Sequence, residues 1–151
     1  MNYKNVKTAL FKLKDSQKTQ VLQRFFKTGK GEYGQGDIFL GIIVPKQREV
    51  AKKYQDLPLD DIQILLLSKI HEHRLTALLI LNIKYQKSNI QEKEKIFRLY
   101  LLNTRNINNW DLIDLSAPNI VGQYLFDKDS SCGKTGRSIL LKMAKSESLW
   151  E

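Results

Sequence analysis

The sequence has 151 residues, which suits one compact domain or a short solenoid and is too short for two independent domains. Hydrophobic residues make up 42% and charged residues 27%, which excludes a disordered chain, and no apolar run approaches the roughly 20 residues that span a bilayer. The formal net charge of +9 favours a polyanionic partner, although a basic protein without such a partner would carry the same charge.

The N-terminal residues predict a pair of helices. Charged residues alternate with bulky ones over residues 1–12. This segment lacks the apolar core of a signal peptide, so we expect a cytoplasmic protein. Val6 and Leu10 lie on one amphipathic stripe at helical spacing. Asp15 or Ser16 can cap a second amphipathic helix, which follows directly.

A glycine-rich loop is expected next, with two further helices after it. Residues 27–41 hold five of the eight glycines and cannot form a stable helix. Pro45 suits the first turn of a helix that runs to about Tyr54, and Pro58 with Asp60 opens another. Short connections of this kind make neighbouring helices antiparallel.

The second half of the chain predicts four more helices. The first covers residues 71–86 and is apolar all round its middle, so it must be covered on most sides. Ser88 and Asn89 offer caps for the next helix, and two others are expected over residues 110–125 and 135–144.

About eight helices joined by short turns predict an all-α fold. Paired helices with a buried inner layer are typical of an α-solenoid, and a compact orthogonal bundle is the alternative. We expect residues 1–151 to form a single domain. Residues 148–151 look like the first turn of a further helix, which indicates the N-terminal portion of a longer protein.

Residues 108–118 contain the most informative pattern for function. Asn109 is a good N-cap, so Trp110 and Asp114 fall at positions i and i+4 and project from one helix face. An indole and a carboxylate would then stand about one turn apart. The alternative is that Asp114 pairs with a cation on a neighbouring helix while Trp110 fills a gap between helices.

A comparison with Asp111 and the position of Pro118 both single out Asp114 as a candidate functional residue. Asp111 is the second residue of this helix, where the positive end of the helix dipole is a sufficient explanation for a carboxylate. Asp114 lies beyond the first turn and has no such explanation. Pro118 leaves the carbonyl of Asp114 without its usual helical partner, so we expect a kink or restart there, which is common where a concave site is built.

These residues resemble the signature of the AlkD-type DNA alkylation repair family. The matching segment is Asn109-Trp110-Asp111-Leu112-Ile113-Asp114, followed by Ser116-Ala117-Pro118 and Gly122. Further matches are Phe39-Leu40-Gly41-Ile42 with Pro45 and Arg48, His71-Glu72 with Arg74 and Ala77-Leu78, and Leu149-Trp150. Together they extend from about Phe25 to the last residue.

The resemblance implies a HEAT-like repeat fold and a monofunctional DNA glycosylase. Its substrates would be cationic alkylated purines of the 7-methylguanine and 3-methyladenine type in double-stranded DNA. The family's catalytic aspartate falls on Asp114 and a site tryptophan on Trp110. A carboxylate can stabilise positive charge developing on the deoxyribose, and an indole can add cation–π attraction. Phe25 stands where the family often has tyrosine, and the family continues beyond Glu151.

The basic residues that we single out as candidate phosphate contacts are spread along the chain, and a solvated surface role is an equal alternative for each. They are Lys30, Lys46, Arg48, Arg105 and Lys134.

We expect no metal and no small-molecule cofactor. His71 and His73 are two residues apart on a helix and point to different faces, so structural roles are expected for both. Cys132 is the single cysteine and lacks the surroundings of a nucleophile.

Two other functions compete with the glycosylase. One is a non-catalytic HEAT-like DNA-binding module, and the other is a protein-interaction scaffold that uses the solenoid groove. Replacing Asp114 by Asn would leave the binding module unimpaired, and a scaffold would show no steep loss of nucleic-acid affinity with salt. We expect a monomer in each case.

Overall fold

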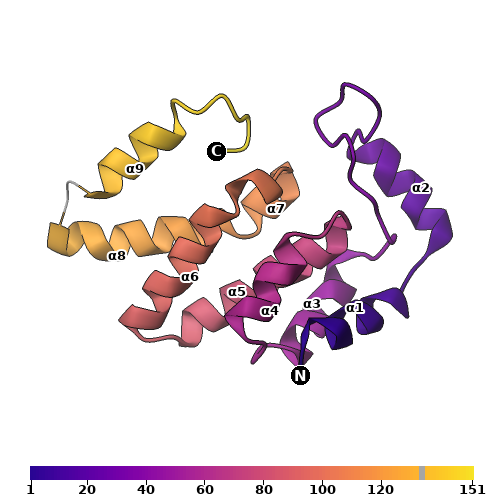
Figure 1. Cartoon of the computed structure of the whole chain (residues 1–151), viewed down its shortest axis with the longest axis horizontal. Coiled ribbons are helices and arrows are strands. Elements are labelled where there is room, and N and C mark those ends of the chain that lie inside the picture. The colour runs from indigo at the N-terminus through magenta and orange to yellow at the C-terminus, as the bar shows by residue number, and fades with distance from the viewer. Residues whose placement is uncertain (133–134) are drawn as a thin grey trace.

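The computed structural model describes residues 1–132 and 135–151, which form a succession of helices (Figure 1). In chain order these are α1 (Tyr3–Phe11), α2 (Ser16–Phe25), α3 (Val44–Lys53), α4 (Leu59–Leu66), α5 (His71–Lys87), α6 (Ile90–Leu102), the 3-10 turn η1 (Thr104–Asn106), α7 (Trp110–Asp114), the π-helical turn η2 (Pro118–Gly122), α8 (Gln123–Cys132) and α9 (Thr135–Met143). The all-α prediction is confirmed. A solenoid of helical repeats is compatible with this order of helices.

Side chains cap the first two helices, and the cap of the second, Asp15, was predicted. Asn2 and Asn5 form a reciprocal capping box at the start of α1, and the Asp15 carboxylate accepts the backbone N–H groups of Gln17 and Lys18 at the start of α2. Pro45 lies in the first turn of α3. In the view of Figure 1, α2 lies at one side of the molecule and α9 at the other.

The predicted glycine-rich loop joins α2 to α3 and is held against the start of α5. The backbone N–H of Ile38 donates to Lys69, and the N–H of His71 donates to Ile38, at 3.1 and 2.9 Å. Gly41 has a φ of +83°, and a Cβ there would collide with the backbone carbonyl of Asp15. A glycine is therefore required where this loop passes the start of α2.

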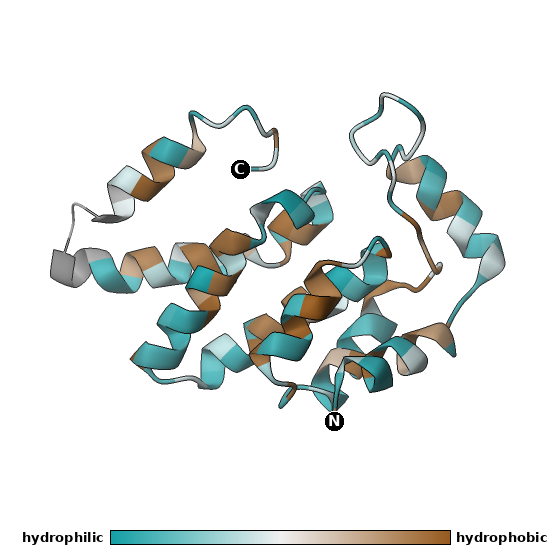
Figure 2. Ribbon diagram, in the orientation of Figure 1, coloured by the Kyte–Doolittle hydropathy of each residue, from teal (hydrophilic) through white to brown (hydrophobic). Residues whose placement is uncertain are grey.

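Helix α5 lies at the centre of the core. It packs on α3 and α4 and also contacts α1, α6, α7 and η2. Leu75, Leu78 and Ile80 are among its fully buried side chains, which confirms that this helix is covered on most sides. Figure 2 shows hydrophobic residues concentrated on the neighbouring α4, whereas the loop after α2 is largely polar.

The predicted helix over residues 110–125 is broken in the structure. α7 ends at Asp114, and the chain then passes through η2 before α8 begins at Gln123. The restart expected at Pro118 is confirmed, because a proline at the first position of η2 has no N–H to continue the helical hydrogen bonds. In the described part of the chain, no helix has both the length and the apolar character needed to cross a membrane.

Candidate functional site

Helix α7 presents two of the predicted site residues to solvent. Trp110 is 40% exposed, and Asp114, at the other end of this short helix, is exposed as well. Among the residues whose side chains the structure describes, the Asp114 carboxylate has no hydrogen-bond or ion-pair partner. The alternative in which a neighbouring cation neutralises Asp114 is therefore wrong within the described residues.

The Trp110 indole rests on aromatic rings from the end of α2. Its ring stacks on Phe26, with centroids 5.4 Å apart and planes 27° apart, and it meets Phe25 edge-on at 6.1 Å. Phe26 is buried, whereas Phe25 is 60% exposed. Trp110 thus packs on one side and keeps an open side, so both a packing role and a recognition role are available to it.

The structure corrects the explanation of Asp111. This side chain is buried, and its Oδ2 receives a hydrogen bond from Nε2 of His71 at 2.8 Å. The helix dipole alone is thus an insufficient account, because a partner from α5 also holds this carboxylate. The spacing of residues within α7 contains no signal for a partner 40 residues away in the chain.

His71 also meets a second carboxylate on its other side. Its Nδ1 lies 3.3 Å from Oδ2 of Asp37, and the same oxygen accepts a hydrogen bond from Arg74 at 2.7 Å. Burial alone would raise the pKa of Asp37, but the His71 hydrogen bond and the Arg74 charge lower it below its usual 3.8. The structural role expected for His71 agrees with this network, and Asp37 and Arg74 are partners that the sequence analysis did not assign to it.

Glu72 belongs to the matched motif, but the sequence did not indicate what its side chain contacts. Its carboxylate is buried, and its Oε1 accepts the backbone N–H groups of Leu40, Gly41 and Ile42 at 2.9, 2.8 and 3.2 Å. A carboxylate that accepts several backbone hydrogen bonds holds a loop firmly. Glu72 therefore fixes the end of the loop that also contributes Asp37.

Asn109 occupies the predicted N-cap position of α7, but its side chain makes no capping hydrogen bond. The residue is fully buried, and both side-chain polar atoms have no hydrogen-bond partner. The prediction that Asn109 caps the helix through its side chain is wrong. The side chains on either side of Asn109 do make polar contacts, because Asn108 accepts a hydrogen bond from Arg74 and Asp111 contacts His71.

The C-terminal segment approaches the same region from the other side. The ring of Trp150 meets Tyr33 of the loop edge-on at 5.6 Å, and the Glu151 carboxylate accepts a hydrogen bond from Thr104 at 2.6 Å. A hydrogen bond from Ser146, the one from Thr104 and the charge of Arg105 lower the pKa of Glu151. In Figure 1 the loop and the C-terminal segment lie on either side of the end of α7.

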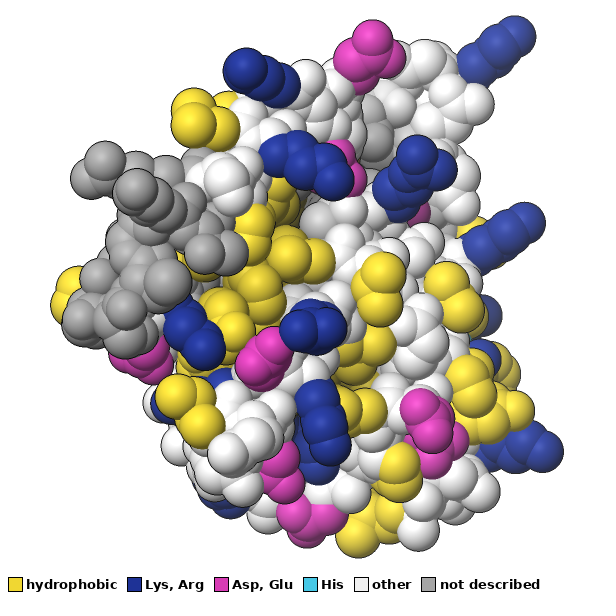
Figure 3. Space-filling view, turned by 60° about the vertical axis from the view of Figure 1, so that its left-hand side comes forward, with side chains coloured by type: hydrophobic (Ala, Val, Ile, Leu, Met, Phe, Trp, Pro, Cys, Tyr) yellow, Lys and Arg dark blue, Asp and Glu magenta, His cyan; other side chains and the backbone are white. Residues whose placement is uncertain are grey.

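The candidate phosphate contacts do not converge on one point. Lys30 is exposed in the loop, Lys46 and Arg48 are exposed on α3, and Arg105 is exposed in η1. Lys134 lies outside the described residues. Figure 3 likewise shows Lys and Arg side chains spread over one face of the molecule, with Asp and Glu side chains between them.

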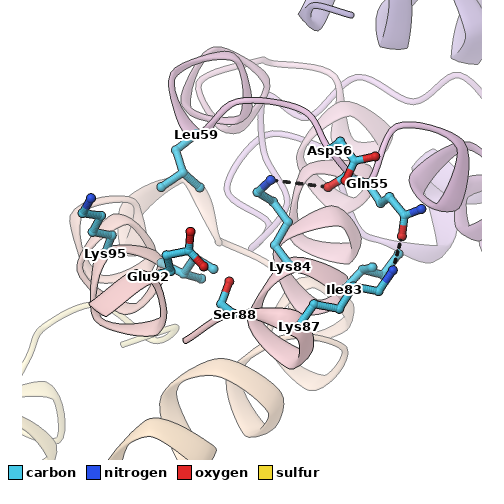
Figure 4. Close-up of a pocket in the computed structure, with 10 residues that line it drawn as sticks. Gln55, Asp56, Leu59, Ile83, Lys84, Lys87, Ser88, Glu92 and Lys95 are labelled. Carbon is cyan, nitrogen blue, oxygen red and sulfur yellow. Dashed lines mark hydrogen bonds between the residues drawn. The ribbon is translucent and has the colours of Figure 1, made fainter. Parts of the chain in front are cut away.

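Two hollows away from α7 are lined largely by charged side chains. The first, of about 230 Å³, adjoins Lys12, Lys14, Lys18 and Lys46, so the structure adds three lysines around a residue that the sequence had already suggested. The second, of about 340 Å³, lies between α4, α5 and α6 (Figure 4). In that pocket Lys84 and Lys87 both donate hydrogen bonds to Gln55. Neither hollow is lined by Trp110 or Asp114.

Comparison with known proteins identifies the family. A family model described as DNA alkylation repair enzyme matches residues 6–151, nearly the whole chain. The chain belongs to this family. Comparisons with curated proteins and with solved structures returned no match.

As a DNA alkylation repair enzyme, the protein has DNA as its substrate. The exposed residues Trp110 and Asp114 on α7 thus belong to a DNA alkylation repair enzyme. Among the described residues, no group of three or more His, Cys, Asp or Glu side chains could hold a metal ion.

Proposed function

We propose that this DNA alkylation repair enzyme is a DNA glycosylase that removes cationic alkylated purines from duplex DNA. The observation that carries the proposal is an exposed, unpaired carboxylate beside an exposed indole on α7. Trp110 and Asp114 are four residues apart on one helix and thus lie on the same face. An unpaired carboxylate keeps its full negative charge for a developing cation.

The reaction needs little from the enzyme apart from charge stabilisation. A purine alkylated at N7 or N3 is cationic, so it takes the electron pair of the broken C1′–N bond and leaves as a neutral base. The sugar becomes an oxocarbenium-like cation, which the Asp114 carboxylate stabilises. Water then adds to C1′ and releases a proton, giving an abasic sugar. A neutral base would need a proton donor, which this pair of side chains does not supply.

Trp110 contributes an apolar wall and a π face. The buried ring of Phe26 supports one side of the indole, so its orientation is fixed before DNA binds. The open side can attract the cationic base or sugar through the ring quadrupole and can exclude water. Exclusion of water strengthens the interaction between Asp114 and the developing positive charge.

The decisive experiment compares Asp114→Asn with Asp60→Asn. Asp60 is an exposed carboxylate in the first turn of α4, so both variants lose one negative surface charge. We expect Asp114→Asn to slow the release of 7-methylguanine from methylated DNA by about 100-fold or more, while both variants keep DNA affinity. The assay measures free base against spontaneous depurination, and DNA containing uracil serves as the neutral-base control.

A wild-type rate equal to spontaneous depurination would refute the glycosylase and favour a non-catalytic DNA-binding module. Equal rates for the two variants would refute the role of Asp114 alone. Release of uracil at a comparable rate would refute the preference for cationic bases.

A further inference from the structure

A buried group of charged side chains lies directly behind α7. It consists of Asp37 from the loop, His71 and Arg74 from α5, and Asp111 from α7, and each residue is at most 7% exposed. His71 stands between the two carboxylates, with Nδ1 3.3 Å from Asp37 and Nε2 2.8 Å from Asp111. Arg74 donates to the same Asp37 oxygen and also to the side chain of Asn108.

The geometry at His71 favours a proton on both ring nitrogens. A neutral imidazole has one N–H donor and one acceptor, so one of the two carboxylates would face a lone pair. An imidazolium donates to both. It also balances the group, because two positive side chains then offset Asp37 and Asp111, whereas a neutral His71 leaves a net negative charge in the interior.

The surroundings of His71 are consistent with a buried cation. Burial opposes the charge, but the hydrogen bonds to Asp111 and Asp37 outweigh burial and raise the pKa of His71, with Arg74 acting in the opposite direction. The ring of Phe39 stacks on the imidazole at 4.4 Å, and that of Phe26 lies at 5.2 Å. Aromatic faces attract a cation and shield it from water.

Two contacts connect His71 to the residues of the proposed reaction. Asp111 directly follows Trp110 in α7, so the hydrogen bond from His71 holds the first turn of that helix. The second contact runs through Phe26, whose ring lies near His71 and stacks on Trp110. Asn109 provides no side-chain cap, so the bond to Asp111 is a polar contact from the core to the first turn of α7, beside those of Arg74 to Asn108 and of Asn82 to the carbonyl of Leu115.

We propose that His71 is a positioning residue: its imidazolium, clamped between Asp37 and Asp111, sets the position of α7 and thereby of Trp110 and Asp114. The catalytic part of this inference depends on the glycosylase function proposed above. The clamp itself does not, because protonation of His71 can be measured without any reaction. His71 touches no substrate in this arrangement and acts only through its neighbours.

The clamp is tested by NMR on ¹⁵N-labelled protein. His71 and His73 are the only histidines, so their ring nitrogens can be assigned with a His73→Gln variant. We expect both nitrogens of His71 to stay protonated to a pH above the ordinary value of 6.5, and Asp111→Asn to lower that midpoint. The Trp110 indole N–H signal should shift in the same variant. A neutral His71 ring at pH 6 in the wild type would overturn the clamp.

The effect on the reaction is tested by single-turnover rates of 7-methylguanine release. We expect His71→Gln and Asp111→Asn to slow release by about 10- to 100-fold with little change in DNA affinity, because a small misplacement of reacting groups is costly. The double variant should be no slower than the slower single variant. Asp111→Glu should restore part of the rate, and His73→Gln should keep the wild-type rate.

The pH profile separates positioning from a general loss of structure. Wild-type release should fall as pH rises through the raised pKa of His71, and this decline should be absent in His71→Gln. Wild-type rates for both clamp variants would overturn the positioning role. A wild type that releases no base would refute the glycosylase, and the NMR result would still decide whether the clamp exists.

Discussion

The two histidines of α5 lie two residues apart and have opposite electrostatic environments. His71 has a carboxylate against each ring nitrogen, whereas Nδ1 of His73 lies 2.9 Å from the hydroxyl of Ser68 and no carboxylate of the described residues contacts its ring. Burial lowers the pKa of His73 to about 4, with further contributions from the charges of Lys7 and Arg74. One ring is therefore stable as a cation and the other as a neutral group.

This difference predicts a stability loss in mild acid that originates at His73. Its folded-state pKa of about 4 lies below the ordinary 6.5, so the stabilisation is present above pH 6.5 and is lost as pH falls towards 4. We expect about 3 kcal/mol less unfolding free energy at pH 4 than at pH 7 from this residue. Urea unfolding at the two pH values measures it, and His73→Gln should show a loss smaller by that amount.

His71 contributes with the opposite sign in another pH range. Its raised pKa means that its stabilisation is complete below pH 6.5 and disappears as pH rises through the folded-state value.

If wild type and His73→Gln lost the same stability between pH 7 and 4, the neutral state inferred for His73 would be wrong.

Single residues were predictable from the sequence only where local geometry decided them. Trp110 and Asp114 were expected on one helix face, and both are exposed on α7. Asp37, Glu72 and the partner of Asp111 were not predictable, because each depends on a contact 30 to 40 residues away in the chain. A buried carboxylate and an exposed one look alike in a sequence.

The connecting elements rather than the helices decide where the site lies. The starts of α2 and α6 were predictable because Asp15 and Asn89 act as caps on backbone groups within three residues. The loop after α2 was predictable only as a loop. Its docking on α5 depends on Glu72 and on the close passage of Gly41 past α2, which local patterns do not encode.

Gly41 provides a test of that passage, with Gly36 as a matched control. Both have a positive φ, but a Cβ at Gly36 meets nothing within 4 Å, whereas one at Gly41 collides with the Asp15 backbone. We expect Gly36→Ala to cost about 1 kcal/mol of unfolding free energy, from conformation alone. Gly41→Ala should cost about 3 kcal/mol or more, since backbone atoms must also move. Equal losses in thermal or urea unfolding would show that the close approach does not matter.

At the scale of the whole molecule, the surplus of positive charge is the feature most relevant to DNA. The charge of +9 was available from composition, but its distribution was not, and the structure places the candidate cations on several separate elements. Lys46 shares its hollow with three other lysines and with Asp15, which pairs with Lys18, so the surplus of positive charge makes that hollow a candidate position for a backbone phosphate.

We therefore predict steeply salt-dependent binding to duplex DNA, with Lys46→Gln reducing the slope of log affinity against log salt by about 0.9. Lys87→Gln is the control, because it removes the same charge from the pocket between α4, α5 and α6. Filter binding over a series of salt concentrations measures the slope for both variants. An unchanged slope for Lys46→Gln would exclude a phosphate contact there, and a flat wild-type response would favour a protein scaffold.

The position of the two tryptophans gives the protein a natural optical probe. Trp110 lies against Phe25 and Phe26, Trp150 lies against Tyr33, and the sequence has no other indole. Fluorescence excited at the indole band therefore comes only from Trp110, on α7 itself, and from Trp150, in the C-terminal segment near α7. When a ligand is added, quenching or a wavelength shift of this fluorescence reports a change around α7 without any attached dye. Variants that keep only one of the two tryptophans show whether the change lies at Trp110 or at Trp150.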